Sequence, residues 1–167
     1  MRRVRRCAVL AGLAAVATVP VQAQDIVRRG AAGFPISSSV TVPAGSGIVF
    51  LSGTLADVAD PAARAGSIER YGDTATQTLS VLGKITRELE AAGLTMADVV
   101  KMNVFLVGDP RKGGAMDFDG LMQAYRQHFG TTAQPNLPAR TTVQVAGLPM
   151  PGALVEIEVI AARAAKP

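Results

Sequence analysis

The sequence predicts an α+β domain in which two helices pack on one face of a mixed β-sheet. Two stretches carry apolar residues at helical spacing, and five shorter stretches carry β-type patterns. Their order along the chain is β-β-α-β-α-β-β, which is typical of helices layered on a sheet. Two helices cover only one face of such a sheet. We therefore expect a partner subunit to cover the other face.

The first 23 residues have the features of a secretory signal peptide. Residues 2–6 contain four arginines, residues 7–19 are apolar, and the segment closes with Val21-Gln22-Ala23. This order predicts export and cleavage after Ala23, which would make the mature protein periplasmic or secreted, with no membrane attachment. An uncleaved membrane anchor is the alternative, but the charge-free stretch of residues 7–24 is short for a membrane span.

The composition of the remaining chain, about 144 residues, suits one globular domain. Four of the 17 basic residues and none of the 13 acidic residues lie in the signal segment. The rest of the chain therefore contains 13 basic and 13 acidic residues. A near-neutral chain without a basic stripe gives no reason to expect a nucleic-acid partner. The single cysteine, Cys7, lies in the signal segment, so the core or oligomerisation must supply stability without disulfides.

The first half of the domain begins after a leader, residues 24–33, that we expect to be flexible. The domain itself is expected to span residues 34–164. Strand patterns at 38–42 and 48–52 are separated by "PAGSG", which predicts a hairpin. A long loop then leads to a helix that Asp73 caps and Gly93 ends. Its apolar stripe comprises Ala75, Thr78, Leu82, Ile85 and Leu89.

The second half contains three further strands and one helix. "DVVKMNVFLV" alternates in the manner of a buried strand, with Met102, Val104 and Leu106 on one face. A second helix is expected over residues 115–129. Two final strands, residues 139–146 and 153–162, are joined by "GLPMPG".

Charged residues interrupt the two final strands. Arg140, Thr142 and Gln144 share one face of the first strand, and Glu156 and Glu158 share one face of the second. One interpretation is a solvent-exposed sheet face with cross-strand ion pairs. The other is a cleft between subunits, in which Arg140 binds a carboxylate and a glutamate acts as a base on water. Spacing does not distinguish Glu156 from Glu158 in that role.

Several of these segments together resemble the RidA family of YjgF-type proteins. They are "VFLSG", "AAGLTMADVVKMNVFLV", "YRQHF", "PARTTVQVAGLP" and "VEIEVIA", and the resemblance covers residues 35–162. It implies a chorismate-mutase-like fold and a homotrimer with ligand clefts between subunits. It also implies hydrolysis of enamines and imines, such as 2-aminoacrylate, to 2-keto acids and ammonia without a cofactor.

The resemblance also implies roles for individual residues. Arg140 matches the arginine that holds the substrate carboxylate, and Glu156 matches the glutamate that positions or activates water. Ser52 and Gly53 match residues that line the cleft, as does Thr142, which replaces the usual cysteine. We expect these residues to bind a small imino or carboxylate substrate. No metal is expected.

Other positions depart from the family pattern. "FPISSSV" lacks the tyrosine found in deaminating members, Met122 replaces a frequent asparagine, and two loops are longer than usual. The leading expectation is therefore an exported hydrolase similar to 2-iminobutanoate/2-iminopropanoate deaminases. The alternative is a non-catalytic protein that binds small carboxylates, or protects unfolding proteins, through the same intersubunit cleft. A hydrolase or isomerase acting on another substrate is a third possibility.

Overall fold

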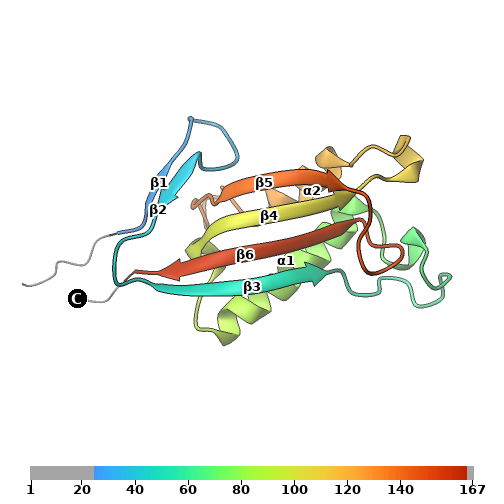
Figure 1. Ribbon diagram of the computed structural model, residues 1–167, viewed down its shortest axis with the longest axis horizontal. Coiled ribbons are helices and arrows are strands. Elements are labelled where there is room, and N and C mark those ends of the chain that lie inside the picture. The colour runs from blue at the N-terminus through green and yellow to red at the C-terminus, as the bar shows by residue number, and fades with distance from the viewer. Residues whose placement is uncertain (1–24, 165–167) are drawn as a thin grey trace, which may run out of the picture.

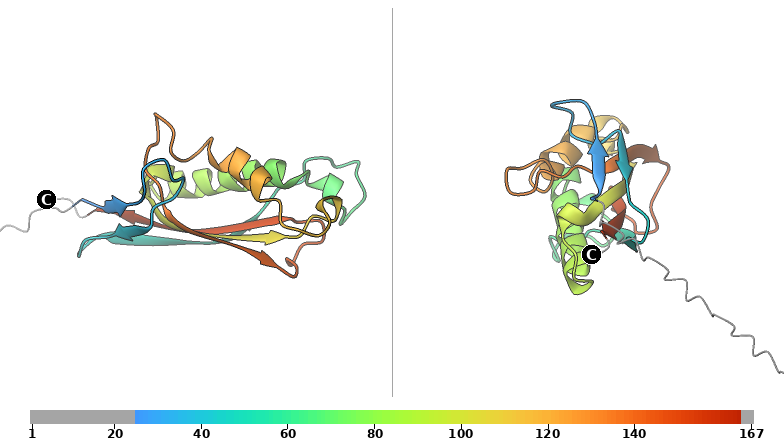
Figure 2. Two further views of the ribbon diagram at one scale, coloured as in Figure 1. Left: turned by 90° about the horizontal axis from the view of Figure 1, so that it is seen from above. Right: turned by 90° about the vertical axis from the view of Figure 1, so that its left-hand side faces the viewer.

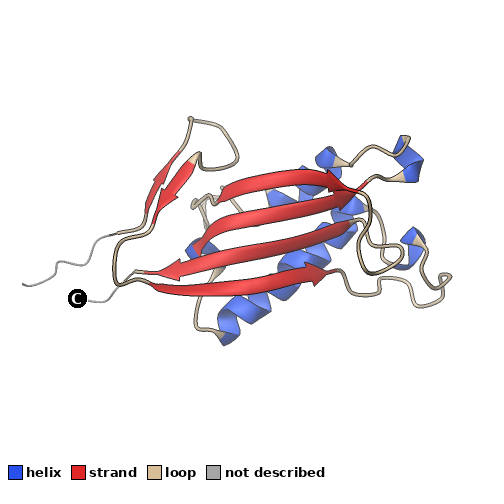
Figure 3. Ribbon diagram, viewed as in Figure 1, coloured by secondary structure: helices blue, strands red, loops and turns tan. Residues whose placement is uncertain are grey.

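The computed structural model describes residues 25–164 and contains a four-stranded sheet in the order β3-β6-β4-β5 (Figure 1). The strands are β3 (Gly47–Leu55), β6 (Val155–Arg163), β4 (Val99–Val107) and β5 (Ala139–Val145). β4 and β5 run parallel, whereas β6 is antiparallel to both of its neighbours. The helices α1 (Thr74–Ala91) and α2 (Phe118–Tyr125) lie on one face of this sheet (Figures 2 and 3). The predicted α+β class with a mixed sheet is confirmed.

The core fills the space between the two helices and the sheet. Alternate residues of the central strands β4 and β6 point towards the helices, as the period of a strand requires. Apolar side chains on the inner stripe of α1 meet them there. Fully buried members of this core include Leu82, Ile85, Leu89, Met102, Leu106, Leu121 and Ile157.

Helix α1 begins and ends where the sequence predicts. The Asp73 carboxylate accepts a hydrogen bond from the backbone N–H of Thr76 at 2.8 Å, which satisfies a donor of the first turn. Gly93 follows the helix with φ of 69°, a left-handed conformation that favours glycine. A single-turn 3-10 helix, η2 (Met96–Asp98), then leads into β4.

Helix α2 is shorter than the predicted span of residues 115–129. Asp117 caps its start by accepting from the backbone N–H of Gly120 at 3.1 Å, and Ala115 forms a β-bridge with Asp109. After Tyr125 the chain continues in tight turns rather than a regular helix. The apolar periodicity of the sequence extends beyond the end of α2 because Phe129, after the helix, is also buried. Its ring stacks on that of Tyr125, with 4.8 Å between the ring centroids.

The predicted hairpin between residues 38–42 and 48–52 is wrong. β2 (Ser39–Thr41) pairs instead with β1 (Val27–Arg29), and β3 pairs with β6 (Figure 1). A turn does form at the intervening segment, where the N–H of Ser46 donates to the Pro43 carbonyl at 3.3 Å. The turn carries the chain from the β1-β2 sheet to the four-stranded sheet. Pairing with β6 there places Val49 and Leu51 of β3 against the core, which favours this arrangement.

The segment expected to be a flexible leader contains β1. Arg28 fixes this strand to the domain, because its Nη2 donates to the carbonyls of Ala97 at 2.8 Å and Val99 at 3.3 Å. A three-residue strand shows no alternation in the sequence, so only these tertiary contacts reveal it. The predicted signal peptide, residues 1–23, lies outside the described residues. Neither helix within 25–164 has the length and apolarity of a membrane span.

The second face of the four-stranded sheet carries no helix of the described residues (Figure 2). We call this side the open face. Phe50 of β3 is 74% exposed there, and Ile48 and Val143 are also exposed. The expectation that a partner subunit covers this face stays a prediction.

Candidate functional site

Arg140 lies on the helix side of β5, where it packs against α2. Its register partner on β4 is Met102, which is buried in the core, so the Arg140 side chain projects towards the helices. The guanidinium carbon lies 4.3 Å from the ring centroid of Tyr125 and 5.7 Å from that of Phe118. Both distances fall within the range of cation–π attraction. The arginine is thus held in a fixed orientation by aromatic rings.

The charge of Arg140 is only partly compensated by the protein. Its Nη2 donates to the thioether sulfur of Met122 at 3.2 Å, whereas its buried Nη1 has no hydrogen-bond partner among residues 25–164. Burial lowers the pKa of Arg140, but a guanidinium remains charged at neutral pH. A buried charged donor without a partner costs free energy. A carboxylate is the ligand that suits Arg140 best, because its two oxygens match the planar guanidinium.

The guanidinium of Arg140 and the side chain of Thr142 line a cleft of about 370 Å³. Thr142 is two residues along the same face of β5, and its buried hydroxyl also has no partner among the described residues. The rest of the lining is mostly apolar and comes from the segment before β2 and from α2. These residues are Phe34, Pro35, Ile36, Phe118, Met122 and Arg126.

Tyr125 holds together the two segments that line this cleft. Its hydroxyl donates to the Pro35 carbonyl at 2.9 Å, which holds the segment before β2 against α2. Burial raises the pKa of Tyr125 to about 12, and the nearby charge of Arg140 opposes this shift. The phenol therefore stays neutral and keeps its proton for the bond to Pro35. This tyrosine lies in "YRQHF", one of the segments that carry the sequence resemblance. The resemblance did not reveal that the tyrosine ring stacks on Arg140.

Ser52, Gly53 and Glu156 form a second cluster. The pairing of β3 with β6 is interrupted between Leu51 and Thr54, so Ser52 and Gly53 form an irregularity in the strand. The Glu156 carboxylate lies directly against Gly53, at the position where any larger residue would place its Cβ. Glycine at position 53 is therefore required by this close approach.

The structure distinguishes Glu156 from Glu158. Glu158 accepts a hydrogen bond from Nδ2 of Asn103 on β4 at 2.7 Å. The Glu156 carboxylate accepts no such bond within residues 25–164 and remains available to water or a ligand. Of the two acids, Glu156 therefore fits the role of a base better.

Within one chain, Arg140 and Glu156 do not come together. β4 separates β5 from β6, so the two final strands are not neighbours. Glu156 pairs with Phe105 of β4, whereas Arg140 pairs with Met102. Because these β4 residues are three apart, the two charged side chains project to opposite faces. The interpretation of cross-strand ion pairs between the final strands is therefore wrong.

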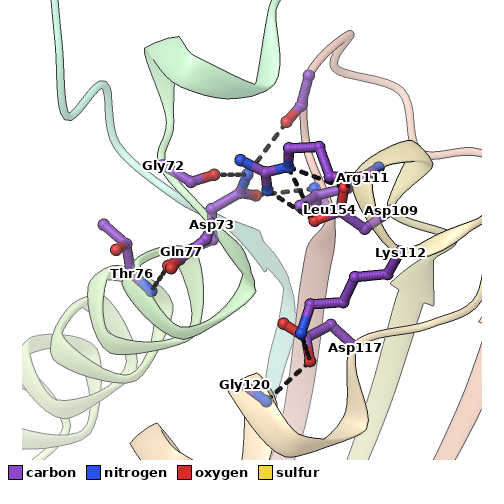
Figure 4. Close-up of polar contacts among 11 residues, drawn as sticks. Gly72, Asp73, Thr76, Gln77, Asp109, Arg111, Lys112, Asp117, Gly120 and Leu154 are labelled. Carbon is purple, nitrogen blue, oxygen red and sulfur yellow. Dashed lines mark hydrogen bonds and ion pairs between the residues drawn. The ribbon is translucent and has the colours of Figure 1, made fainter.

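The loop that precedes α2 is held by ion pairs in which partly exposed cations bind two buried carboxylates (Figure 4). Arg111 binds the buried Asp109 carboxylate through Nε at 2.9 Å and Nη2 at 2.6 Å, and Lys112 lies 3.0 Å from Asp117. The hydrogen bonds from Arg111 lower the pKa of Asp109. Gln144 of β5 binds Gly114 and Met116 of the same loop at 2.9 Å. The long loop is thus an ordered element attached to the strand that carries Arg140.

Comparisons with known proteins agree with this architecture. Residues 34–163 match the family model described as endoribonuclease L-PSP. A RutC family protein of Pyrococcus horikoshii is 39% identical over 90 residues, which are 54% of this chain and 63% of that protein. The structure of Escherichia coli TdcF with bound serine is 32% identical and has a TM-score of 0.54, covering 81% of this chain and 94% of TdcF. Rv2704 of Mycobacterium tuberculosis, a YjgF/YER057c/UK114 family member, is 28% identical with a TM-score of 0.50, covering 82% and 97%.

Proposed function

Because this chain belongs to the endoribonuclease L-PSP family, which includes RutC and YjgF proteins, we propose that it is an exported enamine and imine deaminase. Its substrates are 2-imino acids, and its products are 2-keto acids and ammonia. The observation that carries this proposal is the half-buried Arg140 guanidinium, which aromatic rings orient and which keeps one buried N–H group unpaired. The solved relative TdcF holds serine, which is itself a small carboxylate.

In the proposed reaction, Arg140 anchors the substrate carboxylate and thereby fixes the position of the C=N bond. Glu156 accepts a proton from water, whose oxygen attacks the imine carbon. Glu156 returns this proton to the nitrogen, which gives the neutral carbinolamine. The hydroxyl proton of the carbinolamine then passes through Glu156 to the nitrogen, so that ammonia leaves as the C–N bond breaks and the carbonyl forms. An imine is already electrophilic, so orientation supplies much of the acceleration and the scheme needs no cofactor.

This scheme requires two protomers. Arg140 and Glu156 lie on opposite faces of the sheet within one chain, so one ligand can touch both only if they come from different copies. The exposed apolar side chains of the open face, including Phe50 and Val143, supply a surface on which copies can associate. The proposed assembly is a homotrimer in which each cleft combines Arg140 of one protomer with Ser52, Gly53 and Glu156 of the next.

A non-catalytic carboxylate-binding protein is the second candidate. Met122 favours it, because its sulfur already contacts Nη2 of Arg140 at a position where deaminating relatives often carry asparagine. The family model is described as an endoribonuclease, but we do not propose RNA cleavage for this chain. After residue 23 the chain has as many acidic as basic residues, which gives a nucleic acid little electrostatic attraction.

A coupled assay separates the two candidates. An amino-acid oxidase generates imines in the presence of semicarbazide, which traps them, and the protein competes by releasing keto acid. We expect the protein to lower semicarbazone formation, Arg140→Ala to abolish this effect, and the exposed Arg64→Ala to preserve it. Wild-type protein that binds keto acids without lowering semicarbazone formation would establish the non-catalytic alternative. Acceleration that survives Arg140→Ala would rule out the carboxylate anchor.

A further inference from the structure

We propose that the Arg140 cleft selects 2-imino acids with an apolar side chain of about leucine or methionine size over those with a methyl, hydroxymethyl or acidic side chain. This inference rests on the proposed function and specifies its substrate class. It follows from how polar and apolar groups are distributed in the cleft.

The polar groups of the cleft suffice for the common core of a 2-imino acid. The guanidinium of Arg140 would bind the carboxylate, and Thr142, which lines the cleft from the same face of β5, would lie beside the nitrogen at C2. In the proposed assembly, Ser52, Gly53 and Glu156 of the next protomer lie beside the reacting C=N group, so the side chain of the ligand is placed against the remaining lining residues of this chain. That lining therefore determines which side chain is preferred.

The remaining lining is an apolar wall formed by Phe34, Ile36, Phe118 and Met122. Phe34 is 57% exposed and Phe118 is 41% exposed, so a ligand side chain that covers these rings removes apolar surface from water. A methyl group reaches little of this surface, whereas an isobutyl or thioether chain covers more of it. A hydroxyl placed against the same wall would lose hydrogen bonds to water without replacement.

Besides Arg140, Arg126 is the other charged residue that lines the cleft within the described part of the chain. It is exposed to solvent, and within residues 25–164 its side chain forms no ion pair. A ligand with a second carboxylate would be the natural partner of Arg126, but a solvent-exposed pair contributes little affinity. The apolar wall outweighs this contribution, and an acidic ligand provides the direct test.

Stable 2-keto acids serve as probes, because they keep the carboxylate and the side chain of the imine. Calorimetric titration of the full-length protein should show 4-methyl-2-oxopentanoate binding about tenfold more tightly than pyruvate, given the extra buried methylenes. It should also bind more tightly than 2-oxoglutarate. The same order should appear in the coupled assay for imines derived from leucine, alanine and glutamate.

Variants of the apolar wall test whether its residues cause the preference for a large apolar side chain. Met122→Asn should reduce the tenfold ratio to about twofold, whereas Met122→Leu, which keeps an apolar side chain of similar volume, should preserve it. Phe34→Ala, at an exposed position that does not support the core, should also lower the ratio. Val58→Ala changes an exposed apolar residue outside the cleft and should leave the ratio unchanged.

The outcomes separate this inference from the proposed function. Equal or tighter binding of pyruvate or 2-oxoglutarate, still lost in Arg140→Ala, would overturn the apolar preference and leave the carboxylate anchor standing. A preference that survives both Met122→Asn and Phe34→Ala would also overturn it. Binding that does not depend on Arg140 would contradict both proposals.

Discussion

Arg140 and Glu156 lie on opposite faces of one β-sheet, with β4 between the strands that carry them. Arg140 stacks on Tyr125 of α2, whereas the Glu156 carboxylate lies against Gly53 of β3. Each chain thus presents two separate halves of the proposed site. The function proposed for this family member therefore depends on assembly as much as on either side chain.

Replacing Arg140 by lysine should weaken keto-acid binding by roughly a hundredfold, because the bidentate geometry of the guanidinium–carboxylate pair is lost. Lysine keeps the positive charge, but its ammonium cannot stack on Tyr125 or offer two parallel hydrogen bonds. Titration with 4-methyl-2-oxopentanoate measures the loss. Affinity that stays within a factor of three would show that charge alone, without the planar guanidinium, holds the ligand.

Gly53→Ala should abolish deamination while the protein stays folded. The added Cβ would clash with the Glu156 carboxylate, which must then move away from its position over the strand. Gly47→Ala on the same strand is the control, because its Cβ would meet nothing within 4 Å. Rates are compared in the coupled assay, and circular dichroism verifies folding. Equal deamination rates for Gly53→Ala and Gly47→Ala would show that Glu156 plays no part in the reaction.

Phe50→Asp should separate the protomers and abolish activity. The Phe50 side chain is 74% exposed on the open face, and a carboxylate there would be desolvated by a neighbouring copy. Leu79→Asp changes an exposed residue of α1 on the other side of the molecule and should leave the assembly unchanged. Light scattering gives the masses. A trimer that persists in Phe50→Asp would place the interface elsewhere.

Asp109→Asn should lower the free energy of unfolding at pH 7 by about 1.5–3 kcal/mol, the range for hydrogen bonds to charged groups. Arg111 lowers the pKa of Asp109 in the folded protein. This carboxylate therefore adds stability above its unfolded pKa of about 3.9, and the contribution is lost as the pH falls through the folded value.

Urea unfolding of wild type and Asp109→Asn at several pH values measures this effect. The difference between the two proteins should shrink steadily as the pH falls below about 4. Asp119→Asn, at an exposed position near the same loop, should show a small and nearly constant difference. A constant large difference for Asp109→Asn would mean that the carboxylate charge does not stabilise the loop.

Much of the fold follows from local patterns in the sequence. Asp73 and Gly93 delimit α1 because caps act within a few residues, and β4 alternates because one face is buried. The chorismate-mutase-like α+β arrangement that the family resemblance implied is confirmed. The positions of Arg140 and Thr142 on one face of β5 also follow from the period of a strand.

Strand partners could not be predicted in the same way. Nothing local to β2 shows that it pairs with β1 rather than β3, and Arg28 forms its tertiary contacts with residues about seventy positions away. The insertion of β4 between β5 and β6 likewise depends on the whole chain. The registers of β5 and β6 on β4 put Arg140 and Glu156 on different faces, and no spacing between the two residues encodes these registers.

Mixing two inactive variants tests the shared site most directly. Arg140→Ala and Glu156→Gln should each form trimers and each lack deaminase activity. Refolded together in equal amounts, they should recover about a quarter of wild-type activity, because random assembly joins an intact Arg140 to an intact Glu156 in one cleft of four. Mixed trimers that show no activity above that of the separate variants would contradict a site built from two protomers.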